Sequence, residues 1–235
     1  TASQNGHHQV VRSLINAQAD VNLQLKTGES PLHIASLNGH NQVVSSLIKA
    51  QADVNLQQIQ GGSPLYIASQ NGHHQVVSSL IKAQADVNLQ VNTGASPLYI
   101  ASQNGHHQVV TSLIKAQADV NLQQIQGGSP IHIASRKGHH QVVTSLIKAQ
   151  ADVNLQEVNG RSPLHIASYF GQHQVVSILI KAQADVHLNE NTNGSSPLYA
   201  ASQNNYHQVV TTLIKAQADV NLQVNTGESP LYIAS

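Results

Sequence analysis

A Ser-Pro pair recurs along this chain about every 33 residues, and the sequence around the pair recurs with it. The pairs are Ser30-Pro31, Ser63-Pro64, Ser96-Pro97, Ser129-Pro130, Ser162-Pro163, Ser196-Pro197 and Ser229-Pro230. A fixed period of this length is typical of stacked arrays, in which each unit packs only against its neighbours. We therefore expect one continuous solenoid over residues 1–235, and not a globular domain with a single core.

Unit boundaries placed at the turn before each Ser-Pro pair give six complete units with a partial unit at each end. The complete units are 25–57, 58–90, 91–123, 124–156, 157–189 and 190–223, and the partial units are 1–24 and 224–235. The last complete unit contains an insertion of one residue. Neither partial unit has the polar outer face that terminal repeats need. We therefore expect either further repeats flanking this segment or end-to-end packing of its ends.

Residues 91–123 illustrate the fold expected for one unit. Ser96 suits the N-cap of a short helix, and Pro97 suits its first turn, where no amide hydrogen is needed. Gly105 is expected to end this helix in the left-handed conformation. A second helix should follow, with an apolar stripe formed by Val109, Val110, Leu113 and Ile114. An extended leg and a hairpin turn then lead to the next Ser-Pro pair.

These residues resemble the ankyrin repeat, in which Thr-Pro-Leu-His, Gly-His, paired apolar residues and Ala-Asp-Val-Asn follow one another in a fixed order. The resemblance covers essentially the whole chain, with Ser in place of Thr in every copy. It implies an all-α repeat solenoid of helix-turn-helix units with β-hairpin loops, stacked in a curved superhelix. It also implies protein binding and an intracellular, cytoplasmic location.

One departure from the family pattern is systematic. The family has Gly after its second helix, whereas this chain has Gln18, Gln51, Gln84, Gln117, Gln150, Gln183 and Gln217. Either Gln adopts the left-handed conformation at a cost of roughly 1 kcal/mol, or the second helix ends differently. At the end of the first helix the closing residue is Gly in every copy except Asn205, and Asn tolerates that conformation well.

Composition argues against several classes of function. The chain has 11 basic and 11 acidic side chains, so it lacks the basic surface expected of a nucleic-acid binder. It has no Cys, so it contains neither disulfides nor thiolate metal sites. No apolar run approaches the ~18 residues that indicate a membrane span. We expect no cofactor.

The 15 His residues do not predict a metal site. Several lie in adjacent pairs, namely His7-His8, His73-His74, His106-His107 and His139-His140. Adjacent helical residues do not share a face, and equivalent residues of neighbouring repeats should lie about 10 Å apart. Ser, His and Asp recur in every unit, so no unit holds the unique constellation that a catalytic triad requires. We expect no enzymatic activity and no bound metal.

The repeats differ most in the two residues before the closing Gly, which in this family face the concave groove. Most copies have Gln-Asn there, but two neighbouring copies have Arg136-Lys137 and Tyr169-Phe170. Arg161 lies on the hairpin between them. Arg and Tyr are frequent binding hot spots. Two explanations stay open, neutral drift and a selected contact patch centred on Arg136, Lys137, Arg161, Tyr169 and Phe170, which would suit an acidic, partly apolar protein.

Two functions are compatible with these features. The first is a non-enzymatic protein-interaction scaffold, which presents a concave groove of first helices and hairpin tips. The second is a structural spacer within a larger protein, with no ligand of its own, and the near-identity of the copies favours it.

Overall fold

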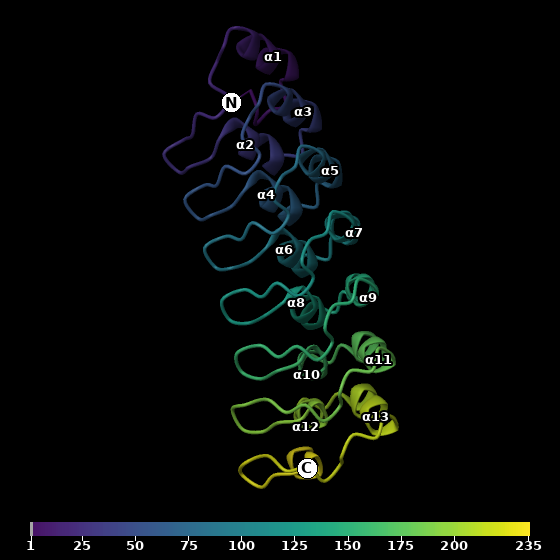
Figure 1. The fold of residues 1–235 in the computed structure, drawn as a ribbon. Coiled ribbons are helices and arrows are strands. Elements are labelled where there is room, and N and C mark those ends of the chain that lie inside the picture. The colour runs from purple at the N-terminus through teal and green to yellow at the C-terminus, as the bar shows by residue number, and fades with distance from the viewer. Residues whose placement is uncertain (1) are drawn as a thin grey trace. The chain divides into compact units, whose positions relative to one another are not determined.

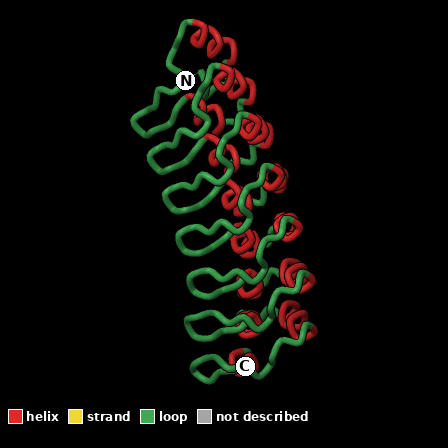
Figure 2. The backbone as a smooth tube through the Cα atoms, viewed as in Figure 1, coloured by secondary structure: helices red, strands yellow, loops and turns green. Residues whose placement is uncertain are grey.

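The computed structural model describes residues 2–235, and these divide into two compact units, the first ending at Asp119 and the second running from Val120 to Ser235. Each unit consists of helix pairs joined by tight loops (Figures 1 and 2). Every pair has a short first helix that begins at a Ser-Pro pair and a nine-residue second helix.

In the first unit, α2 (Pro31–Leu37), α4 (Pro64–Gln70) and α6 (Pro97–Gln103) are first helices. The second helices are α1 (His8–Asn16), α3 (Asn41–Lys49), α5 (His74–Lys82) and α7 (His107–Lys115). First helices pack on first helices and second helices on second helices, while the two helices of one repeat also pack on each other.

The second unit has the same arrangement. Its first helices are α8 (Pro130–Lys137), α10 (Pro163–Tyr169), α12 (Pro197–Gln203) and α14 (Pro230–Ile233), and its second helices are α9 (His140–Lys148), α11 (His173–Lys181) and α13 (His207–Lys215). Helices again pack in sequential order within and between repeats. This is the all-α packing of an ankyrin-type repeat array, so the predicted fold class is confirmed.

The ends of the first helices follow the residues that predicted them. Ser96 Oγ accepts a hydrogen bond from the Tyr99 amide at 3.1 Å, and Pro97 is the first helical residue. Gly105 closes this helix region with φ +71°, and Asn205 takes the same left-handed conformation with φ +57°. The local caps therefore depend on neighbouring residues within the same repeat.

The ends of the second helices decide between the two possibilities left open for Gln. All seven of these Gln residues are left-handed, with φ between 62° and 65°. The amide of Gln84 still bonds the Ile81 carbonyl at 3.0 Å, so the helix closes as it would with Gly. The chain thus keeps the cap geometry of the family with a residue that is strained in it.

The loops before the first helices are tight turns. In the loop 91–95, the Val91 amide bonds the Ala95 carbonyl at 3.0 Å and the Gly94 amide bonds the Val91 carbonyl at 2.7 Å. The extended segments on either side of each turn do not form a β-ladder, and residues 2–235 contain no β-strand. The hairpins implied by the resemblance are therefore present as hydrogen-bonded turns and not as paired strands.

The core runs between the two rows of helices. In the repeat 91–123, Leu98 and Leu113 are fully buried, and Val109 and Val110 are at most 1% exposed. Ile114 lies at the edge of the stripe and is partly exposed. Burial of a Leu side chain contributes about 1.5–3 kcal/mol. Each repeat can obtain that contribution only by packing on its neighbours, because its own two helices do not enclose these residues.

Candidate partner-binding surface

Three of the five predicted patch residues lie together in the second unit. Arg136 stands in the last turn of α8, and Tyr169 and Phe170 end α10 in the next repeat. The Arg136 guanidinium carbon lies 5.0 Å from the centroid of the Phe170 ring. The rings of Tyr169 and Phe170 meet edge to face, with centroids 5.1 Å apart and planes at 75°. We call these three residues the Arg-aromatic cluster.

The Arg-aromatic cluster is held in place although it is exposed. Tyr169 is 41% exposed and Phe170 is 36% exposed. A cation–π contact at an exposed site contributes about 0.5–1 kcal/mol, and an aromatic pair contributes a similar amount beyond burial. These contacts restrict the three side chains before any partner arrives. Lys137 follows Arg136 directly and is also exposed.

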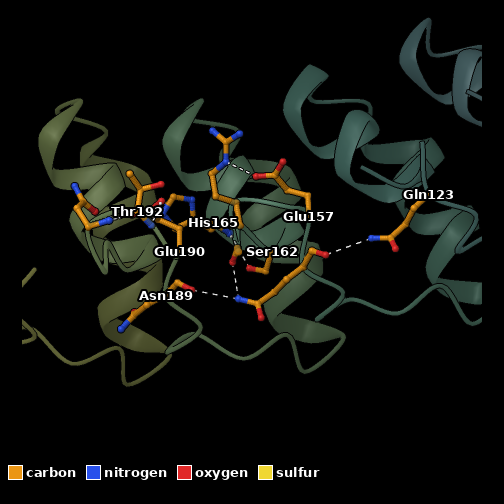
Figure 3. Close-up of polar contacts among 11 residues, drawn as sticks. Gln123, Glu157, Ser162, His165, Asn189, Glu190 and Thr192 are labelled. Carbon is orange, nitrogen blue, oxygen red and sulfur yellow. Dashed lines mark hydrogen bonds and ion pairs between the residues drawn. The ribbon is translucent and has the colours of Figure 1, made fainter. Parts of the chain in front are cut away.

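Arg161 has a different environment from the one its sequence position suggests. Its Nε donates a hydrogen bond to Glu157 Oε1 at 2.7 Å, within the same hairpin turn (Figure 3). The Glu157 side chain is only 9% exposed, and that of Arg161 is 37% exposed. The pair largely cancels the Arg161 charge. Sequence reasoning missed Glu157, whose backbone amide also bonds the Arg161 carbonyl at 3.2 Å across the turn.

Next to this pair lies a buried histidine. His165 on α10 is 3% exposed (Figure 3), and among the described residues neither of its ring nitrogens has a hydrogen-bond partner of normal geometry. Burial lowers the pKa of His165 to about 4, against an opposing attraction from Glu190. Burial likewise lowers the pKa of His132, its equivalent in the preceding repeat, to about 4. Both imidazoles are therefore neutral near pH 7.

His33 is the corresponding residue of the first unit, and both of its ring nitrogens have hydrogen-bond partners. Its Nε2 donates to the Gly62 carbonyl at 3.0 Å, in the next repeat. Its Nδ1 accepts from the Ser30 amide at 3.1 Å and lies 2.8 Å from Ser30 Oγ. Burial lowers the pKa of His33 as well. This position therefore serves helix capping and contact between repeats.

Glu190 begins the hairpin that contains the extra residue. Its two carboxylate oxygens accept the amides of Asn193 at 2.7 Å and Thr192 at 3.0 Å (Figure 3). Burial raises the pKa of Glu190, but these hydrogen bonds outweigh burial, and the net pKa is lowered. Glu190 therefore acts as an ionised cap of the longer turn.

The adjacent pair His73-His74 makes structural contacts in opposite directions. His73 Nε2 donates to the Leu37 carbonyl of the preceding repeat at 2.9 Å. His74 Nε2 lies 3.0 Å from Ser112 Oγ of the following repeat. Within residues 2–235, no group of three or more His, Cys, Asp or Glu side chains is arranged to hold a metal ion. Over the same residues, none of the helices has the length and apolarity required to cross a bilayer.

Comparison with known protein families covers almost the whole chain. The family described as ankyrin repeats (3 copies) matches residues 1–91, 47–124 and 98–190. The single ankyrin repeat matches residues 193–225, which include the unit with the insertion. No curated protein matches the chain.

Proposed function

The chain belongs to the ankyrin-repeat family, and from that premise we propose that it is a non-enzymatic scaffold that binds a protein through the concave side of residues 120–235. Ankyrin repeats are generally protein-protein interaction modules, and proteins built from them are typically binding scaffolds without catalytic activity. The proposal adds a location for the partner, around Arg136, Lys137, Arg161, Tyr169 and Phe170. The cytoplasmic location expected from the resemblance stays a prediction.

The Arg-aromatic cluster is the observation that supports this location. Arg136, Tyr169 and Phe170 contact one another across two repeats while their outer surfaces stay accessible. Arg and Tyr are enriched among residues whose truncation costs an interface 2 kcal/mol or more. Side chains already restricted in the free protein lose less entropy on binding, which leaves more of the contact energy as affinity.

The charges near the cluster indicate the chemistry of the partner. Arg136 and Lys137 are exposed and form no ion pair within the described part of the chain, whereas Arg161 is bound to Glu157. We therefore place an acidic group of the partner against Arg136 and Lys137, and an apolar group against Tyr169 and Phe170. Arg161 contributes shape and hydrogen bonding more than net charge.

The test uses residues that the chain itself carries at the equivalent position. The double variant Tyr169→Gln/Phe170→Asn reproduces the Gln203-Asn204 pair that closes α12, so the helix end is compatible with it. Proteins that bind the wild-type chain are identified by quantitative affinity capture and mass spectrometry, and the affinity of each is then measured by surface plasmon resonance. A true partner should bind the double variant at least about tenfold more weakly. Gln203→Ala, at the equivalent position, should leave its affinity unchanged.

Equal affinity for the wild type and the double variant, with the helical circular dichroism retained, would refute the proposed location. The spacer function makes the opposite prediction to the scaffold. It is favoured by the near-identity of the repeats, because a binding groove usually diversifies. If the chain is a spacer, no protein should be retained above the level seen with an unrelated repeat array of the same length.

A further inference from the structure

Three columns of side chains link each repeat to the next within a unit. In the first column, the side-chain oxygen of an Asn accepts a hydrogen bond from the backbone N–H of an Asp one repeat later, as Asn55 Oδ1 does from Asp86 at 2.8 Å. In the second, Gln57 Nε2 donates to the Gln90 carbonyl at 3.1 Å. In the third, the residue after the closing Gly reaches back to the preceding repeat, as His73 does to Leu37.

In the second unit, the boundary between repeats 124–156 and 157–189 keeps all three columns. Asn154 Oδ1 accepts the Asp185 amide at 2.8 Å, and Gln156 Nε2 donates to the Asn189 carbonyl at 3.2 Å. Gln172 replaces the His of the third column and still donates to the Arg136 carbonyl at 3.2 Å. This boundary, between repeats 124–156 and 157–189, is therefore fully linked.

The boundary between repeats 157–189 and 190–223, which we call the 189/190 joint, has lost the hydrogen bonds of all three columns among the described residues. His187 stands where the other repeats have Asn, and its side chain makes no hydrogen bond to Asp219 among the described residues. The turn itself is unchanged, because the His187 amide still bonds Asp185 Oδ1 at 2.8 Å. The substitution has removed only the group that would reach the next repeat.

The other two columns end at the same joint. Asn189 replaces Gln and is one methylene shorter, and its Oδ1 is buried without a hydrogen-bond partner. Tyr206 replaces the His of the third column. Its ring still lies against Gly171 of the preceding repeat, but within residues 2–235 its side chain makes no hydrogen bond to that repeat. Ala200 also replaces the Ile found at this position of the other first helices, which reduces the apolar volume on α12.

Among the described residues, two hydrogen bonds remain across the 189/190 joint, from the Asn191 amide to the Asn159 carbonyl at 2.7 Å and between His173 Nε2 and Thr212 Oγ1 at 3.2 Å. By contrast, residues beyond the joint are linked to one another. The Asn225 amide bonds the Asn193 carbonyl at 2.8 Å, and the Tyr199 hydroxyl donates to Glu228 at 3.1 Å. The segment beyond the joint therefore keeps hydrogen bonds of its own.

We infer that the 189/190 joint is a built-in opening point, at which residues 190–235 detach as one cooperative unit while residues 120–189 stay folded. In a repeat array, stability is a sum of repeat terms and nearest-neighbour interface terms, so the weakest interface opens first. Opening uncovers the apolar flank of α11, including Val176 and Leu179, which are fully buried in the closed form. The Arg-aromatic cluster lies before the joint, so the inference does not rest on the proposed function.

Native-state hydrogen exchange on the intact 235-residue chain tests this directly. The helices α9 (HQVVTSLIK) and α13 (HQVVTTLIK) differ at one residue, so their unprotected amides exchange at nearly the same rate. Amides of α12 and α13 should exchange with one common opening constant, at least about tenfold faster than those of α9 and α11. Equal protection of α9 and α13 would overturn the inference.

A terminal repeat can also fray because of its position alone, and a repaired joint separates the two causes. The double variant His187→Asn/Asn189→Gln restores the residues of the first two columns. It should slow exchange in α13 by about 10–100-fold, as expected for one or two hydrogen bonds, and leave α9 unchanged. No slowing in α13 would show that the terminal position, and not the joint, controls opening.

The converse variant moves the weak point by one repeat. Asn154→His introduces at the preceding boundary the residue that the chain carries at position 187. Exchange in α11 should then accelerate about tenfold, while α9 keeps its wild-type rate. Unchanged exchange in α11 would contradict the role assigned to the Asn column, and the helical content of each variant is checked by circular dichroism.

Discussion

The seven left-handed Gln residues store strain that a simple substitution should release. Each has φ between 62° and 65°, and each side chain is exposed. For L-residues with a Cβ, the left-handed conformation costs roughly 1–2 kcal/mol because Cβ approaches the following carbonyl oxygen. Gly avoids this contact, but it loses more backbone entropy on folding, by about 0.5–1 kcal/mol. The net gain from Gln→Gly is therefore about 0.5–1 kcal/mol per site.

Four simultaneous substitutions make the effect measurable. Gln51→Gly and Gln84→Gly lie in the first unit, and Gln150→Gly and Gln183→Gly lie in the second. If the sites are independent, the four should add about 2–4 kcal/mol, because equivalent caps in different repeats share no side-chain contacts. For a chain of this size, that corresponds to a rise in Tm of roughly 5–15 °C.

Thermal unfolding followed by circular dichroism measures the change, with urea unfolding as an independent measure of free energy. The matched control replaces the same four residues with Ala, which removes the same exposed side chain but keeps Cβ. The Ala variant should show no gain, since its left-handed strain is the same as that of Gln. If the Gly and Ala variants melt together, or if the Gly variant melts below the wild type, then backbone strain is not the relevant quantity at these caps.

Two further predictions concern buried and crowded positions. The pKa values of His132 and His165 are lowered by burial from 6.5 to about 4, so the unfolded chain binds protons there that the native chain does not. The free energy of unfolding is therefore not reduced by these groups above pH 6.5, and it falls by about 3 kcal/mol for each His as the pH drops towards 4. Tyr occupies this position in other copies, so His165→Tyr should remove one of the two losses when urea unfolding is compared at pH 7 and pH 4.5. If the variant loses as much free energy between the two pH values as the wild type, the pKa assigned to His165 is wrong. At Gly39, which has φ +71°, an added Cβ would lie 2.7 Å from His73 Nδ1, whereas at Gly227, with φ +87°, it would meet no atom within 4 Å. Gly39→Ala should cost about 1–2 kcal/mol of strain plus the displacement of His73, so it should lower the Tm more than Gly227→Ala does; equal losses would show that the histidine contact adds nothing.

Local structure could be predicted because it depends on residues close together in the chain. The Ser-Pro pair starts each first helix through a cap three residues long, as in Ser96 and Tyr99, and the closing Gly or Asn ends it. The period predicted the packing of like helices, because each repeat presents the same apolar stripe. The sequence could not decide whether Gln adopts the left-handed conformation or the second helix ends differently, because both backbone conformations were compatible with the same residues.

The candidate surface was predicted only in part. Divergence from the other copies identified Arg136, Tyr169 and Phe170, yet nothing in the sequence showed that a guanidinium would lie over an aromatic ring 34 residues away. Glu157 was missed as the partner of Arg161, because a hairpin residue was considered for its exposure and not for its neighbours. The adjacent His residues were assigned to structure or surface, and the opposite directions of the contacts that His73 and His74 make were not foreseen.

The sequence alone thus determined the repeat length, the two helices of each unit and the conformations that close them. These features arise from interactions between residues up to five positions apart, and the complete copies repeat them. The tertiary structure alone decided which side chains of successive repeats meet, including the Arg-aromatic cluster and the broken columns at the 189/190 joint. Such contacts join atoms more than 30 residues apart, and their geometry is set by how one repeat stacks on the next, which the residues of a single repeat do not specify.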